Sequence, residues 1–125
     1  MIYQRVRVLK RIELEEYIKS NYNADVDYPW KKYPDYTVFR HSNNKKWFAL
    51  IMSVKKSKLG LQGNDLLNIV NFKCDPIMIG SLLTNSGFFP AYHMNKTNWI
   101  TVALDDSILD ETMKMLLQIS YDKTI

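Results

Sequence analysis

Apolar residues recur every three or four positions in three stretches of the chain, a period typical of amphipathic helices. They predict a first helix over residues 12–22, a second beginning at Asp75-Pro76, and a last helix over residues 108–122. An acidic residue followed by proline often starts a helix, because the carboxylate accepts free backbone N–H groups and proline needs no partner there. Ser86-Gly87 should end the second helix, since glycine readily adopts the left-handed cap conformation.

Four other segments alternate apolar and polar residues or are apolar throughout, which predicts strands. They are residues 36–41, 46–56, 66–74 and 100–104. Short polar segments separate the first three, so we expect an antiparallel meander with a further strand beside it. The second strand is apolar on both sides and should be central in the sheet. Its two faces are predicted to carry Phe48, Leu50, Met52 and Val54 on one side and Trp47, Ala49, Ile51 and Ser53 on the other.

The remaining segments are expected to be loops, including the proline-containing residues 25–35 and the short stretch 88–90. Residues 2–9 alternate loosely, which fits either a short strand or a lead-in to the first helix. A chain of 125 residues is long enough for one core. We therefore predict a single domain over residues 1–125 of the α+β class, a two-layer sandwich with helices packed on one face of an antiparallel sheet.

The composition is that of an ordinary globular protein, with 46% hydrophobic and 24% charged residues. The longest apolar run, residues 47–52, is too short to span a bilayer, and the first residues lack the features of a secretory signal. A single cysteine, Cys74, excludes an intrachain disulfide. We expect a cytoplasmic monomer with no membrane partner.

Positive charge is concentrated in one central segment. Residues 1–30 carry five basic and five acidic side chains, and residues 59–125 carry four basic and seven acidic ones. Residues 31–58 carry eight basic side chains and one acidic side chain, a net charge of +7. The eight are Lys31, Lys32, Arg40, Lys45, Lys46, Lys55, Lys56 and Lys58.

This charge distribution is suited to a phosphate backbone. Tyr33, Tyr36 and Trp47 lie between the basic residues and offer rings on which bases can stack. DNA is therefore the expected partner, contacted through basic strands. The same lysines also fit a purely structural role, because lysines at strand edges and tips protect a sheet from aggregation.

The most unusual segment is residues 90–99, Pro-Ala-Tyr-His-Met-Asn-Lys-Thr-Asn-Trp. Five polar or amphipathic side chains lie within eight positions of it: Tyr92, His93, Asn95, Lys96 and Trp99. An amide beside an ammonium group is suited to holding a phosphate or carboxylate, with the aromatic rings as walls. Two interpretations stay open: a packed loop whose asparagine closes its own turn, or the rim of a ligand site.

No metal, cofactor or catalytic site is indicated. The chain has two histidines, His41 and His93, and one cysteine, with no pair at the short spacing of metal ligands. No nucleophile and base, and no glycine-rich phosphate loop, occur at a recognisable spacing. We expect a protein that is not an enzyme and uses no cofactor.

The same segment resembles the signature of the MmcQ/YjbR family. The resemblance rests on Tyr92-His93-Met94-Asn95-Lys96, Trp99, Thr101-Val102 and Leu104-Asp105. Further pieces follow the family's order between Tyr28 and Tyr121: Tyr28-Pro29-Trp30, Val38-Phe39-Arg40, Lys46-Trp47-Phe48-Ala49-Leu50-Ile51, Lys73-Cys74-Asp75-Pro76 and Ser120-Tyr121. Two positions depart from the family's pattern: Ala91, where glycine is usual, and Leu109, where proline is favoured.

The resemblance implies a frataxin-like (CyaY-like) α+β fold, similar also to a double-wing DNA-binding domain of a phage transcription factor. It implies a small, non-enzymatic DNA-binding protein, and this is our leading hypothesis. The alternative is a module that binds a small ligand or a protein, with the Tyr92–Trp99 loop as its pocket.

Overall fold

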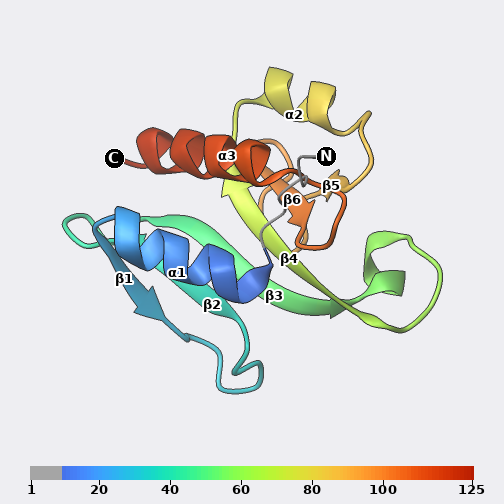
Figure 1. The fold of residues 1–125 in the computed structure, drawn as a ribbon, viewed down its shortest axis with the longest axis horizontal. Coiled ribbons are helices and arrows are strands. Elements are labelled where there is room, and N and C mark those ends of the chain that lie inside the picture. Colours follow the sequence, from blue (N-terminus) through green and yellow to red (C-terminus); the bar gives the residue numbers. More distant parts are fainter. Residues whose placement is uncertain (1–9) are drawn as a thin grey trace, which may run out of the picture.

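The computed structural model describes residues 10–125, which form a six-stranded antiparallel sheet and three α-helices (Figure 1). The strands lie in the order β1-β2-β3-β4-β6-β5. Their bounds are β1 Ala24–Asp27, β2 Thr37–His41, β3 Trp47–Lys55, β4 Leu66–Lys73, β5 Phe88–Pro90 and β6 Trp99–Ala103. The helices are α1 Arg11–Asn21, α2 Pro76–Leu82 and α3 Asp110–Lys123, with a short 3-10 helix η1 at Lys56–Leu59.

The predicted α+β class, the three helices and the β2–β3–β4 meander are confirmed, but α2 ends at Leu82 and not at the expected Ser86-Gly87. β3 is central, as expected, because it pairs with β2 on one side and β4 on the other. Asp75 does precede α2, with Pro76 in its first turn, but its carboxylate lies 2.5 Å from the ammonium group of Lys123 and caps no backbone group. The prediction for residues 2–9 lies outside the described residues.

Two strands are missing from the sequence prediction. Residues 24–27, assigned to a loop, form β1 along β2, and residues 88–90 form β5 along β6. Both are edge strands of only three or four residues. A segment this short cannot display an alternating pattern, so the prediction was wrong at both edges of the sheet.

The helices cover one face of the sheet. Figure 1 shows α1 and α3 lying across the same side, and their apolar side chains meet those of the strands in one buried cluster. Leu14 and Ile18 of α1 and Leu117 of α3 are fully buried there. Arg11 fastens α1 to the sheet, because its guanidinium donates to Asn68 Oδ1 at 3.0 Å and to Thr37 Oγ1 at 3.2 Å.

A bulge in β3 changes the predicted faces of that strand. Phe39 pairs with Ala49 and Arg40 pairs with Trp47, so Phe48 has no partner in β2. One extra residue turns Phe48 to the same side as Ala49, into the helix-side core, and Trp47 to the opposite side. The predicted faces of these two residues were therefore wrong, while Leu50, Met52 and Val54 share a face as predicted.

Candidate functional site

The other face of the sheet is covered by two loops instead of helices. Its buried side chains form a second apolar cluster, in which Val38, Leu50, Met52 and Ile69 are almost completely shielded from solvent. The 28–36 loop joins β1 to β2, and the 91–98 loop joins β5 to β6. Trp30 from the first loop, and Tyr92 and Met94 from the second, pack against this cluster.

The 91–98 loop is closed by its own polar side chains. Asn95 Oδ1 accepts the backbone N–H of Thr97 at 2.8 Å, and the Lys96 ammonium group donates to the carbonyl of Ala91 at 2.9 Å. Trp99 is only 9% exposed and belongs to β6. These three motif residues therefore build the loop. Asn95 therefore has one of the two roles that the sequence left open: its side chain closes the turn of its own loop.

A buried polar network fastens this loop to the sheet. The Thr101 hydroxyl accepts the backbone N–H of Tyr92 at 2.8 Å and donates to Asn71 Oδ1, and Asn71 Nδ2 donates to the Tyr92 carbonyl at 3.0 Å. Asn71 and Thr101 lie opposite each other on β4 and β6, and both are 0% exposed. Tyr92 is thus held through both its backbone N–H and its backbone carbonyl.

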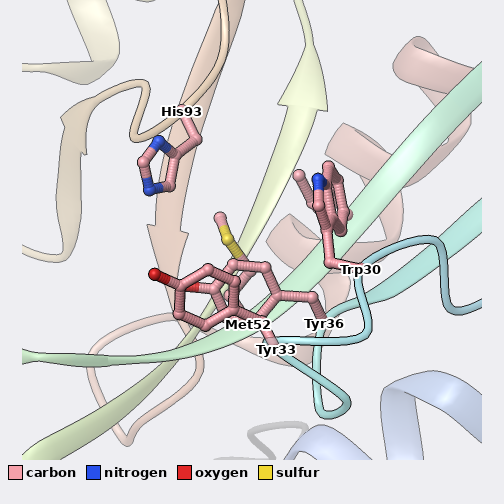
Figure 2. A pocket seen from close by; sticks show the side chains of 6 residues that line it. Trp30, Tyr33, Tyr36, Met52 and His93 are labelled. Carbon is pink, nitrogen blue, oxygen red and sulfur yellow. The ribbon is translucent and has the colours of Figure 1, made fainter.

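Between the two loops lies a cleft with an inner and an outer cavity. The inner cavity has a volume of about 290 Å³ and is lined by Trp30, Tyr33, Tyr36, Leu50, Met52 and His93 (Figure 2). The outer cavity, about 390 Å³, shares Tyr33, Tyr36 and His93 and extends to Tyr92, Lys55 and Lys58. A smaller cavity of about 170 Å³, lined by Lys58, Tyr92 and Lys96 among others, adjoins them.

The aromatic walls of the inner cavity support one another. The rings of Tyr33 and Tyr36 are stacked, with centroids 4.7 Å apart and planes 13° apart. Trp30 meets Tyr36 edge-on at 5.8 Å and Trp47 edge-on at 5.6 Å. Burial raises the pKa of Tyr36, so its phenol is neutral at physiological pH. The walls are therefore aromatic rings that pack against one another.

His93 closes the rim of the cleft. Its backbone has φ of 62°, and among the described residues only Lys45 is another non-glycine with positive φ. Histidine adopts this conformation more readily than most residues, and such exceptions cluster at functional sites. In Figure 2 its imidazole faces Trp30 across Met52, above the two tyrosine rings. Ala91, at the position where the MmcQ/YjbR signature usually has glycine, does not have a positive φ.

The structure divides the predicted basic residues into separate groups. Arg40 is ion-paired with Asp27 at 2.8 Å, and Lys45 with Asp25 at 2.5 Å. The hydrogen bond from Lys45 lowers the pKa of Asp25. Both acids belong to β1, the strand that the sequence prediction missed, so part of the expected positive charge is compensated at this edge.

The other basic residues lie elsewhere on the surface. Lys46 is exposed near the β2–β3 turn, and Lys31 and Lys32 are exposed in the 28–36 loop. Lys55, Lys56 and Lys58 lie at the opposite end of β3 and in η1, and two of them, Lys55 and Lys58, line the outer cavity. The lysines at this end and the 91–98 loop therefore meet at one site.

His41 and Cys74 lie away from the cleft, in the helix-side part of the molecule. His41 Nε2 shares a hydrogen bond of 2.7 Å with Thr124 Oγ1, and burial lowers the pKa of the imidazole. Burial likewise raises the pKa of the Cys74 thiol. Within residues 10–125, no three metal-ligating side chains gather at one point, and no helix has the length and apolarity needed to cross a membrane.

Sequence reasoning found part of the cleft. It singled out Tyr92 and His93 by their motif and Tyr33 and Tyr36 as stacking rings, and the structure brings all four together. Trp30, which the sequence offered only as part of the family resemblance, also lines the inner cavity. Its position between a proline and a basic turn gave no signal for a wall, because the opposite wall lies about 60 residues further along the chain.

A sheet with helices on one face and an open aromatic cleft on the other defines a small α+β protein whose site lies on the loop-covered face. The YjbR family model matches residues 19–123, and the chain belongs to the YjbR family. The uncharacterized protein YyaQ of Bacillus subtilis (strain 168) is 38% identical over 117 residues, which cover 94% of this chain and 99% of YyaQ.

Solved structures support the same assignment. A crystal structure of a Pseudomonas syringae protein has 38% identity and a TM-score of 0.91, covering 94% of this chain and 100% of its own. A solution structure of a protein from the same organism gives 38% identity and a TM-score of 0.83, covering 94% of each chain. The Deinococcus radiodurans protein DR2400 shares the fold at 22% identity and a TM-score of 0.67, covering 90% of this chain and 75% of its own.

Proposed function

We propose that this protein is a non-enzymatic DNA-binding protein that contacts phosphates through the lysines at the β3–η1 end of the cleft. One observation carries the proposal: Lys55 and Lys58 line the same cavity as Tyr33, Tyr36 and His93. Ammonium groups beside aromatic rings that line a cavity are suited to holding a nucleic-acid strand, because the cations attract phosphates and the rings stack on bases.

The proposed interface is narrower than the sequence alone indicates. Arg40 and Lys45 are engaged with acids of β1, which leaves them less able to attract phosphates. Lys46 and Lys55 are separated by most of the length of β3, about 30 Å for an extended strand. We therefore assign the phosphate contacts to Lys55, Lys56 and Lys58, together with Lys31 and Lys32 of the 28–36 loop.

The test is the salt dependence of DNA binding, measured by fluorescence anisotropy from about 50 mM salt upward. We expect the variant Lys55→Gln/Lys58→Gln to lower the slope of log K against log salt by about 1.4 to 1.8, since two phosphate contacts are lost. A matched control, Lys10→Gln/Lys19→Gln, removes the same charge beside α1 on the helix-covered side. Equal effects of the two pairs, or no DNA binding by the unmodified protein, would refute the proposal.

A second function, binding a free small ligand, is favoured by the inner cavity. Its volume of about 290 Å³ is near the lower limit of known ligand pockets, which begin at about 300 Å³. The motif residues Tyr92 and His93 line the adjoining outer cavity. A thermal-shift screen of metabolites tests this function, because a ligand present at 100 times its Kd stabilises the protein by about 2.7 kcal/mol.

A further inference from the structure

The inner cavity has the size and walls to receive one flat ring system. Its floor is made by Leu50 and Met52, which are 1% and 0% exposed, and its walls are the rings of Trp30, Tyr33 and Tyr36. Because these rings are fixed against each other, a bound ring loses little free energy to ordering the protein. A cavity of about 290 Å³ is too small for a ligand much larger than one ring system.

The outer cavity adds positive charge directly beside that space. It shares Tyr33, Tyr36 and His93 with the inner cavity and brings in Lys55 and Lys58. The ammonium group of Lys32 also lies 5.8 Å from the centre of the Tyr33 ring. An aromatic ring bound inside would therefore have cations within reach of an anionic group attached to it.

One carboxylate, that of Asp35, also lines the outer cavity, and it is already engaged by donors of the protein. Its Oδ2 accepts the backbone N–H of Ser53 at 3.0 Å and lies 3.8 Å from Arg11 Nη1. The cleft thus presents an apolar aromatic slot next to a region of positive charge. This order of chemistry matches a nucleotide, which joins a flat base to a phosphate.

We propose that the cleft holds one unpaired nucleobase with its phosphate, so that the protein binds single-stranded nucleic acid in preference to duplex. This rests on the proposed function and deepens it. A base inside a duplex is stacked and paired, and its faces cannot reach a recessed floor such as that of Leu50 and Met52. An unstacked base can enter the slot and stack on the tyrosine rings.

The experiment compares a labelled single strand of about 12 nucleotides with its duplex, using fluorescence anisotropy at low salt. In Tyr33→Ala we expect single-strand affinity to fall about 5- to 140-fold, the range measured when one stacking side chain is removed. Tyr28→Ala is the matched control: Tyr28 is 57% exposed against 42% for Tyr33, in the same loop, and lines neither cavity. We expect Tyr28→Ala to bind the single strand as tightly as the unmodified protein does.

The outcomes separate this inference from the function on which it rests. Equal affinity of Tyr33→Ala and Tyr28→Ala, or duplex binding as tight as single-strand binding, overturns the nucleobase slot and leaves the lysine result standing. If the Lys55→Gln/Lys58→Gln pair has no effect either, the DNA-binding function falls as well.

A nucleoside monophosphate, titrated alone, distinguishes the two sources of the same chemistry. We expect it to bind in the cleft more weakly than the single strand, because it lacks the neighbouring phosphates, and to lose affinity in Tyr33→Ala. Binding as tight as that of the strand would overturn the preference for nucleic acid and assign a free nucleotide as the ligand.

Discussion

Replacing Thr101 with valine should lower the free energy of unfolding by about 2–4 kcal/mol. Valine has nearly the shape of threonine, so the substitution leaves no cavity and removes only the hydroxyl. Two groups then lose their partner: the backbone N–H of Tyr92, bonded at 2.8 Å, and Oδ1 of the fully buried Asn71. A buried polar group left unpaired costs about 1–3 kcal/mol, and partial relaxation reduces the sum for two.

Urea denaturation followed by far-UV circular dichroism measures this change as a shift in midpoint at constant slope. For a chain of this length the same loss corresponds to a fall in Tm of about 8–16 °C. Thr97→Val is the matched control, because Thr97 is exposed in the same loop and its hydroxyl makes no hydrogen bond among those resolved in residues 10–125. If both variants stay within about 0.5 kcal/mol of the unmodified protein, the network does not anchor the loop.

Three further outcomes are expected. Ser120→Ala should lose about 1–3 kcal/mol in urea denaturation, because the buried hydroxyl joins α3 to two strands through bonds of 2.6 and 2.8 Å. Gly87→Ala should be less stable than Gly60→Ala by about 1–3 kcal/mol. Both glycines have positive φ, but a Cβ at Gly87 would lie 2.8 Å from Ile108 Cδ1, whereas Gly60 faces open space. Similar losses of stability in the two variants would contradict this. Burial lowers the pKa of His41, so the unfolded chain binds that proton first and stability should fall as pH drops below about 6.5; thermal unfolding of His41→Asn should show a flatter pH dependence in this range.

The helices and the central strands were predictable because burial on one or both sides leaves a repeated pattern over many residues. β1 and β5 were not, since each offers at most four residues and pairs on one side only. The position of Phe48 was also hidden, because alternation assumes one residue opposite one and a bulge places two there. The bulge depends on how β3 pairs with β2, so the sequence of β3 alone does not indicate it.

The site was predictable in its parts and not in its assembly. The motif drew attention to the 91–98 loop and left open that Asn95 closes its own turn, but spacing gave no sign that Lys96 bonds within the loop while His93 faces a cavity. The positive segment was visible, yet its compensation by Asp25 and Asp27 depends on β1 lying beside β2. Contacts between segments distant in sequence decided the roles of His93 and of the basic residues beside β1.

Beyond its bulge, β3 directs alternate side chains to the two faces of the sheet. The side chains of Ala49 and Ile51 pack against the helices. Those of Leu50 and Met52, which alternate with them along the strand, lie beneath the cleft on the opposite face. Substitutions at Ala49 and Ile51 therefore act on the packing beneath the helices, whereas substitutions at Leu50 and Met52 act on the floor of the cleft. A change at either pair also costs stability, because all four side chains are buried.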